Sequence, residues 1–419
     1  MALTAFVRSL VCIAIATWLT TLPAQAQAEP APFRRGIAIS HSMAWAQIEP
    51  PPSTAFVFPP FADPSYRLKT AELQSLRRSG FDFVRLAVDP GPFLQLDGVR
   101  RDRLDQILLE QVNLILSSGL AVIVDFHPSD LHPQYTAAAL TKGAATPAFR
   151  DYMRLLERTA SLLDRVKSRR VAFELMNEPP VSPGAWQPMV EAAYHAARAR
   201  APNLMLVLPG ASEGMPEGLL GLRAAAFRSD PAVLYTFHYY EPFQFTHQGA
   251  SWNAARHLAD VPYPANARPL RESLDATAAA IEASSLSQAQ KVIAGLDARR
   301  MLESYRRSGF DRAAIARSLD RIVAWGQSNG VPASRIFLGE FGVLSGRSLH
   351  AVRAGERRQW FADVRAEAEA RGFFWAVWVY RGAGGFALTD DDRDVDVAPD
   401  IVAALGLKPR TRHSVMPID

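Results

Sequence analysis

The stretch Val171–Pro180 reads VAFELMNEPP, and the fold can be inferred outward from it. Its first six residues are apolar apart from Glu174, which is typical of a strand that is buried on both faces. Asn177 and Glu178 follow, and two prolines then stop the strand. Parallel α/β folds place their chemistry at the carboxyl ends of such strands. Glu174 lies earlier on the strand, and no role is inferred for it.

A second stretch, Arg335–Gly342, has the same character. It reads RIFLGEFG, so an apolar run leads into Gly339 and Glu340. We expect Glu178 and Glu340 to face each other across a binding cleft, because both follow buried strands.

The rest of the chain repeats a helix followed by a strand. Apolar runs near residues 37, 83, 122, 172, 205, 235, 337 and 375 predict eight strands, and segments of helical periodicity lie between most of them. This alternation implies parallel pairing. Eight units favour a closed (β/α)8 TIM barrel of the α/β class over an open doubly wound sheet. No Gly-x-Gly-x-x-Gly or P-loop motif follows any strand, which further disfavours a nucleotide-binding sheet.

The connection between the sixth and seventh strands is much longer than the others, at about 100 residues. Phe243–Arg268 is rich in aromatic residues and proline and is expected to be a loop, whereas Leu270–Arg317 has helical periodicity that continues to Gln327. We interpret this segment as an enlarged insertion in a single barrel domain that spans residues 29–419, not as a second domain.

Residues 1–28 have the features of a secretory signal peptide. Arg8 supplies the positive charge, Leu10–Leu22 is apolar, and Ala-Gln-Ala triplets at 24–26 and 26–28 fit a cleavage site. An uncleaved membrane anchor is the alternative, but threonines interrupt the apolar run, which is short for a membrane span. We expect a secreted or periplasmic protein without stable membrane insertion after cleavage.

Composition excludes several classes of function. Lys and Arg number 46 against 42 Asp and Glu, and the arginines are spread along the chain, which indicates solvated helix faces and not a nucleic-acid groove. Cys12 is the only cysteine and lies in the leader, which excludes disulfides, thiolate metal sites and cysteine nucleophiles from the mature protein. Asp390–Asp396 lacks the glycine and terminal glutamate of a calcium loop, so a solvated loop is expected there. We expect no metal, no cofactor and a monomer.

Polar residues gather at the predicted strand ends. The second, third, fourth, sixth, seventh and eighth strands end in Arg85, His127, Asn177 with Glu178, His238 with Tyr240, Glu340, and Trp378 respectively. In a parallel barrel all carboxyl ends open on one face, so these residues converge. Two carboxylates among such neighbours suit glycoside hydrolysis, with retention of configuration at a separation of about 5 Å and inversion at about 6.5–9.5 Å.

These motifs resemble glycoside hydrolase family 5, the cellulase-type retaining enzymes of clan A. The similarity runs from about Gly36 to Leu407 through FVRL, VDFH, ELMNEP, TFHYY, LGEFG and FWAVW. The resemblance implies that Glu340 is the nucleophile and Glu178 the acid/base. It also implies that Asn177 hydrogen-bonds the sugar 2-hydroxyl and Glu340.

The resemblance assigns supporting roles to the remaining strand-end residues. Arg85 would keep Glu340 ionised and Tyr240 would orient it. His127 and His238 would line the subsite where the bond breaks, and Trp378 would lie under the sugar, on a strained peptide that is often cis in the family. An acid that faces an ionised carboxylate is expected to have a raised pKa.

The implied substrate is a β-linked polysaccharide or oligosaccharide, and the implied activity is that of an endo-β-1,4-glucanase. A β-mannanase or another β-glucanase is the alternative within this class, with Phe243–Arg268 as the expected selector. A non-catalytic polysaccharide-binding protein of a polymer-export apparatus is the alternative outside it. Asp125 is expected to support His127, and Trp325 to lie in the core. Sugar binding and packing remain equally open for four residues: His41, Trp45, Trp186 and Trp252.

Overall fold

The computed structural model describes residues 32–344, 352–382, 385–391 and 394–408. The expected signal peptide, residues 1–28, lies outside them, so its cleavage and export stay predictions. Within the described ranges, no helix combines the length and the apolar character that a membrane span requires.

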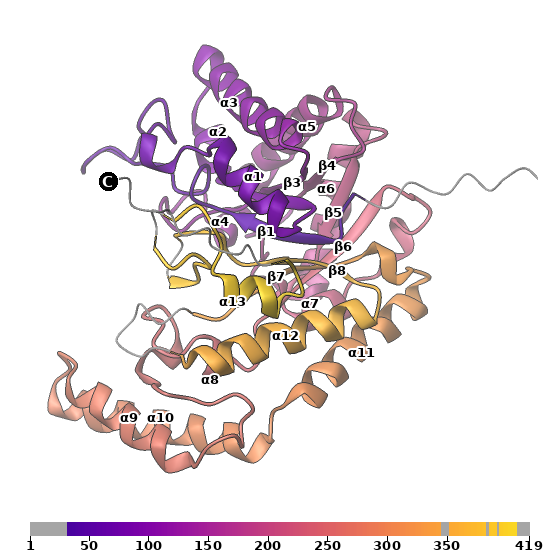
Figure 1. Cartoon of the computed structure of the whole chain (residues 1–419). Coiled ribbons are helices and arrows are strands. Elements are labelled where there is room, and N and C mark those ends of the chain that lie inside the picture. Colours follow the sequence, from indigo (N-terminus) through magenta and orange to yellow (C-terminus); the bar gives the residue numbers. More distant parts are fainter. Residues whose placement is uncertain (1–31, 345–351, 383–384, 392–393, 409–419) are drawn as a thin grey trace, which may run out of the picture. The chain divides into compact units, whose positions relative to one another are not determined.

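Eight parallel strands close into a barrel, as the sequence predicts (Figure 1). Closure is made by the first and last strands, with Arg35 paired to Trp375 and Ile37 to Val377. Almost every strand residue is buried, because helices cover the outer face and side chains fill the interior. The strands are β1 Arg35–Ile39, β2 Phe83–Val88, β3 Ala121–Phe126, β4 Val171–Glu174, β5 Met205–Pro209, β6 Val233–Tyr239, β7 Ile336–Phe341 and β8 Phe374–Val377.

The helices begin and end where local chemistry dictates. At α5, for example, the Thr146 side chain accepts a hydrogen bond from the Phe149 amide and Pro147 opens the first turn. The α-helices are α1 Thr70–Ser79, α2 Gly91–Gln95, α3 Gly98–Ser117, α4 Ala137–Leu140, α5 Pro147–Asp164, α6 Pro183–Arg200, α7 Pro216–Leu220, α8 Phe243–Thr246, α9 Leu270–Glu282, α10 Gln288–Ser308, α11 Arg312–Asn329, α12 Ala354–Ala370 and α13 Pro399–Ala404. Short 3-10 turns are Pro64–Tyr66, Ser212–Gly214, Ala224–Ala226, Ala254–His257 and Ala333–Arg335.

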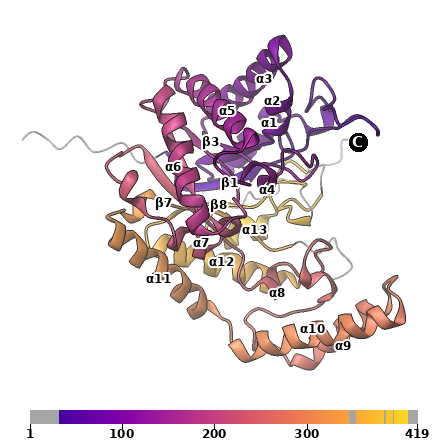
Figure 2. The ribbon, with the colours of Figure 1, turned by 180° about the vertical axis from the view of Figure 1, so that it is seen from behind.

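The long segment between β6 and β7 contains α8, α9, α10 and α11. The helical stretch expected from Leu270 onwards is broken twice, because Ser287 caps a new helix and Gly309 ends it with a left-handed φ of 58°. Helices α9 and α10 lie side by side in both ribbon views (Figure 2). Asp260 joins this segment to the start of α12 through its ion pair with Arg353.

The barrel interior changes character along its axis. One layer is aromatic, with the rings of Phe337 and Phe374 stacked at 4.5 Å and Phe83 packed edge-on beside them. Arg85 lies two residues after Phe83 on β2, so its side chain projects to the same interior face one layer further on. The apolar layer therefore supports a charged layer at the carboxyl ends of the strands.

Candidate active site

Glu340 lies near the end of β7 and is held on both carboxylate oxygens. Arg85 Nη1 donates to Oε1 at 2.5 Å, and the Tyr240 hydroxyl donates to Oε2 at 2.8 Å. Only 4% of the Glu340 side chain is exposed. The orientation of this carboxylate is therefore fixed by two buried donors.

Arg85 is the centre of the charged layer. Its Nε and Nη2 donate to the two oxygens of Glu174 at 2.8 Å each, and Nη2 lies 3.1 Å from Asp125 Oδ2. Burial alone would lower the pKa of Arg85, but the carboxylates of Asp125, Glu174 and Glu340 raise it well above its usual value. Arg85 is thus a permanent cation shared by three buried acids.

The view that Glu174 has no part in the site is wrong, because Glu174 accepts the two-pronged hydrogen bond that aims Arg85 at Glu340. A signal for this existed in the sequence. A glutamate inside a buried strand needs a partner, and the buried strand FVRL offers an arginine.

Asn177 and His127 extend the network from the other side. Asn177 Oδ1 accepts from Arg85 Nη2 at 2.8 Å, and its Nδ2 lies 3.4 Å from His127 Nε2. Within the described part of the chain, Asn177 reaches Glu340 through Arg85 and not by the direct hydrogen bond that the resemblance implies. His127 Nδ1 lies 2.8 Å from Asp125 Oδ2, which confirms Asp125 as its support. Burial raises the pKa of Asp125 to about 7.

Trp378 lies beyond the end of β8 and stacks on His127. The two ring centroids are 5.2 Å apart and the planes differ by 6°. The peptide between Trp378 and Val379 is cis, as the resemblance implies. Only 8% of Trp378 is exposed, and its role under a sugar ring stays a prediction.

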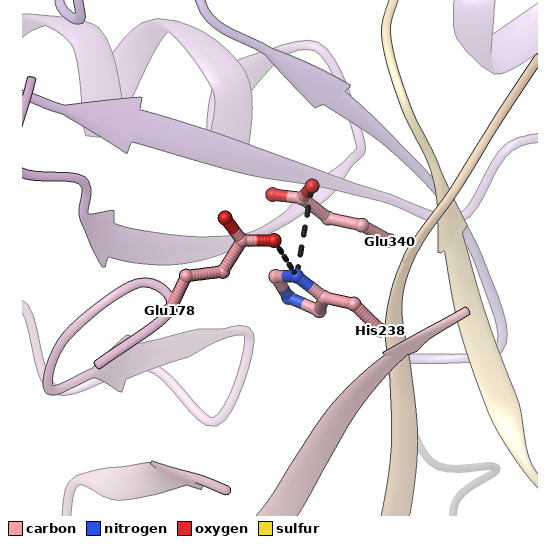
Figure 3. Close-up of side chains that lie close together, drawn as sticks. All are labelled: Glu178, His238 and Glu340. Carbon is pink, nitrogen blue, oxygen red and sulfur yellow. Dashed lines mark hydrogen bonds and ion pairs between the residues drawn. The ribbon is translucent and has the colours of Figure 1, made fainter. Parts of the chain in front are cut away.

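Glu178 follows β4 and is the more open carboxylate, with 35% of its side chain exposed. Its backbone has φ of 44°, a left-handed value that is unusual for a residue with a side chain. His238 Nδ1 lies 2.7 Å from Glu178 Oε1 and 3.6 Å from Glu340 Oε2 (Figure 3). A register irregularity between Phe237 and His238 brings His238 opposite Glu340.

Burial shifts the pKa values of both His238 and Glu178. It lowers the pKa of His238 to about 4, so the imidazole is neutral near pH 7. It also raises the pKa of Glu178 to about 7, while the charges of His127 and Arg85 oppose the rise. The direction agrees with the sequence-based expectation, but the main cause is burial and not the facing carboxylate.

Ligand atoms of Glu178, His238 and Glu340 all lie within 4.8 Å of one another. Among the described residues, these three could hold a metal ion. Both oxygens of Glu340 already accept hydrogen bonds from Arg85 and Tyr240, however, so a cation would compete with a fixed guanidinium. The short distance between the two carboxylates is closer to the separation of about 5 Å in retaining glycosidases than to that in inverting ones.

The residues left open by the sequence fall into two groups. Trp186 is buried, and its indole donates to the Pro209 carbonyl at 2.9 Å, so it packs in the core. Trp325 is buried as expected, and His41 is also buried, whereas Trp45 and Trp252 are exposed.

Only part of Asp390–Asp396 is described, because residues 392–393 lie outside the described ranges. In the part that is described, the Asp391 amide donates to Asp394 Oδ2 at 2.9 Å.

Comparison with known proteins agrees with this geometry. The model of the cellulase family (glycosyl hydrolase family 5) matches residues 61–384. Endoglucanase 3 of Fibrobacter succinogenes is 25% identical over 342 residues, which cover 76% of this chain and 47% of that protein. Cellodextrinase A of Ruminococcus flavefaciens is 28% identical over 197 residues, which cover 44% of this chain and 55% of that protein. The chain thus spans about half the length of these relatives.

Solved structures share the fold at lower identity. The cellulose synthase subunit Z of Clostridioides difficile superposes with a TM-score of 0.62 at 21% identity, covering 89% of this chain and 99% of that one. The endoglucanase Cel5A of Thermotoga maritima superposes with a TM-score of 0.61 at 22% identity, covering 90% of this chain and 97% of that one. With the family match extending over most of the chain, the protein belongs to the cellulase family, glycosyl hydrolase family 5.

Proposed function

We propose that this protein is a retaining endo-β-1,4-glucanase in which Glu340 is the nucleophile and Glu178 the acid/base. The observation that carries the proposal is the pair itself. One oxygen of Glu178 lies within 4.8 Å of one oxygen of Glu340, but the two carboxylates have unlike surroundings. Glu340 has a buried cation and a phenol on its oxygens, whereas Glu178 is partly exposed and has a pKa of about 7.

The first step breaks the glycosidic bond. Glu340 attacks the anomeric carbon while Glu178 gives its proton to the leaving oxygen, and a glycosyl ester forms on Glu340. Because Arg85 and Tyr240 each donate a hydrogen bond to one oxygen of Glu340, this carboxylate is already oriented and needs no reorganisation before attack. Because its pKa is raised to about 7, Glu178 can carry a proton near neutral pH, which suits a proton donor.

The second step releases the sugar. Glu178, now ionised, removes a proton from a water molecule that attacks the same anomeric carbon, and Glu340 leaves as a carboxylate. His238 is neutral, and its Nδ1 can accept from the acid form of Glu178 or donate to the ionised form. The same imidazole can therefore hold Glu178 in both of its protonation states.

The names of the relatives support a β-glucan substrate, since they include endoglucanases and a cellodextrinase. Structural neighbours widen the choice. One is a Thermotoga maritima Cel5A structure in complex with mannotriose, and another is a Paenibacillus pabuli xyloglucanase. A β-mannanase or another β-glucanase is therefore the alternative substrate assignment. The exposed Trp252 belongs to the segment Phe243–Arg268, which we propose as the selector.

Reducing-sugar assays on carboxymethyl cellulose, mixed-linkage glucan, xyloglucan, mannan and xylan test the substrate. We expect the highest activity on the first two, and no activity on carboxymethyl cellulose would contradict the endoglucanase assignment. Proton NMR of the first product tests the mechanism, because retention gives a β-anomer and inversion an α-anomer.

A polysaccharide-binding protein without catalysis is the rival outside this class. The wild-type protein, E178Q and E340A separate the two cases. If all three bind cellulose equally and none of them hydrolyses any of the five polymers, the barrel is a binding module.

A further inference from the structure

The loop that follows β5 contacts the acid/base but has no role so far. It runs from Gly210 to Gly218 and reads GASEGMPEG, with glycines at every fourth position. A Cβ on Gly210 would lie 2.5 Å from the Leu219 amide nitrogen, and a Cβ on Gly218 would lie 1.8 Å from the Ala211 carbonyl oxygen. The loop is therefore folded so tightly on itself that neither end admits a side chain.

The middle of this loop is a left-handed turn. Ser212, Glu213 and Gly214 have φ of 53°, 57° and 72°, and the first two carry side chains that disfavour this region. Glu178, at the end of the neighbouring strand, is left-handed too, with φ of 44°. Unfavourable backbone conformations that cluster in this way are found at sites where the surrounding structure enforces a geometry.

Two backbone hydrogen bonds tie the turn to the chain that carries Glu178. The Ser212 amide donates to the Val181 carbonyl at 3.0 Å, and the Glu213 amide donates to the Pro179 carbonyl at 3.2 Å. Both acceptors come within three residues after Glu178. The turn therefore restrains the segment whose conformation sets the direction of the Glu178 side chain.

Gly214 makes the closest approach. A Cβ at this position would lie 3.0 Å from His238 Nδ1 and 3.2 Å from Glu178 Cγ. This is the same Nδ1 that holds Glu178 Oε1 at 2.7 Å. A methyl group at position 214 would press on both partners of that hydrogen bond.

We propose that the turn Ser212–Gly214 positions Glu178 for proton transfer, with Gly214 as a positioning residue that leaves room for the Glu178–His238 hydrogen bond. This rests on the proposed role of Glu178 as the acid/base. A purely structural role, in which the loop only connects β5 to α7, predicts different kinetics.

The charge of Glu213 allows a second test of the same turn, because its carboxylate raises the pKa of Glu178. Glu213 is exposed, so its replacement does not disturb packing. The other titratable or charged groups that face Glu178 lie on β2, β3, β4, β6 and β7 or directly after them, and they are Arg85, Asp125, His127, Glu174, His238, Tyr240 and Glu340.

The first experiment compares G214A with G330A. Gly330 is also left-handed, with φ of 67°, but a Cβ there would meet no atom within 4 Å. Both variants thus carry the same backbone penalty, and only G214A crowds Glu178. Aryl β-cellobiosides are the substrates, because a dinitrophenyl leaving group needs no protonation whereas a phenyl leaving group does.

For G214A, we expect kcat/KM to fall by about 100-fold on phenyl β-cellobioside and to stay within about threefold of the wild type on the dinitrophenyl compound, because a misplaced acid affects only substrates that need it. G330A should match the wild type on both. An equal loss on both substrates in G214A would assign the turn a structural role and overturn the proposal.

Two further measurements keep the test decisive. A crystal structure of G214A should show the 2.7 Å contact between Glu178 Oε1 and His238 Nδ1 broken, and an unmoved carboxylate would overturn the proposal even if the wild-type protein proves inactive. That inactivity would instead refute the proposed function.

If G214A does not fold, E213Q takes its place. We expect the basic limb of its pH–kcat/KM profile to move to lower pH by on the order of 0.3 pH unit at low ionic strength. The shift should shrink as salt is added. An unchanged profile at low salt would overturn the proposal.

Discussion

Glu178 and Glu340 are the same residue type at the ends of two strands of one barrel, and the protein treats them in opposite ways. Glu340 is almost fully buried, with Arg85 on one oxygen and Tyr240 on the other. Glu178 is about one-third exposed, has a neutral imidazole on one oxygen and has a left-handed backbone. The orientation of Glu340 is therefore set by hydrogen bonds from a cation and a phenol. The orientation of Glu178 is set by a hydrogen bond to a neutral imidazole and by its own backbone conformation.

This difference shows that the surroundings of each glutamate, and not the residue type, determine which one suits the role of nucleophile and which the role of acid. A carboxylate that receives hydrogen bonds from a cation and a phenol is stabilised as an anion, which suits a nucleophile. A carboxylate whose hydrogen-bond partner is a neutral imidazole, as for Glu178, lacks that direct stabilisation of its anion and keeps its proton to higher pH, which suits an acid. The variants below exchange or remove these environments.

Removing the Glu340 carboxylate should have the largest effect on activity. We expect E340A to lose at least about 10^4-fold in kcat, because the covalent step has no substitute nucleophile. Sodium azide should restore turnover and give the α-glycosyl azide, since the anion attacks from the face that Glu340 vacates. E217Q, which alters an exposed glutamate in a surface ion pair with Arg321, is the control. A β-configured azide product would exchange the two proposed roles.

Removing the Glu178 carboxylate should have the next largest effect on activity. We expect E178Q to lose about 10^2- to 10^4-fold in kcat/KM on cellulose oligomers, because general acid catalysis supplies about that much. In the wild type, kcat/KM should fall as pH rises through about 7, since Glu178 then loses the proton that it must donate.

The pH dependence provides the internal check on that variant. E178Q has no proton to lose, so its profile should lack the basic limb. A basic limb that persists unchanged in E178Q would mean that another group titrates there.

Weakening the cation that fixes Glu340 comes third. Arg85 donates in two directions at once, to Glu174 and to Glu340, and a lysine ammonium cannot reproduce this planar fork. We expect R85K to lose about 100-fold in kcat through poorer orientation of Glu340.

The stability of this variant should fall as well, because lysine leaves buried carboxylates without their partner. Thermal unfolding followed by circular dichroism measures this effect. R85K with wild-type kcat and wild-type melting temperature would contradict the central role of Arg85.

Removing the Tyr240 hydroxyl should have the smallest effect on kcat. We expect Y240F to lose about 10-fold in kcat, the value of one hydrogen bond to a charged acceptor, with little change in KM. Y305F is the matched control, because its hydroxyl is also buried and donates to a carbonyl, that of Pro262, at 2.8 Å. Equal losses in the two variants would remove Tyr240 from the set that orients Glu340.

The sequence predicts the barrel and most of the charged layer because both follow from local pattern. Buried parallel strands are continuous apolar runs, and a polar residue directly after such a run is visible without knowledge of its partners. Glu178 is found in this way. Arg85 and Glu340 are visible as charged residues in apolar runs, but the expectation that Arg85 ends its strand is wrong, because β2 continues to Val88.

Pairings that cross the barrel cannot be predicted so directly. Glu174 and Arg85 are 89 residues apart and meet only when β2, β3 and β4 have paired, so a glutamate inside a buried strand signals that it has a partner but not which residue that partner is. The turn Ser212–Gly214 was missed for another reason. Its function lies in backbone conformation and in an absent side chain, which residue chemistry does not display.

The pairing of β1 with β8 has a consequence for how the chain reaches this state. Arg35 and Trp375 are register partners although 340 positions (375 − 35) separate them. During synthesis, one edge of β1 therefore stays without its partner until β8 has emerged from the ribosome. Long-range closure of this kind is slow, since chain entropy is lost before the contact is gained. A ribosome-bound chain that stops before residue 374 would expose two open sheet edges, and both would be able to pair with other nascent chains.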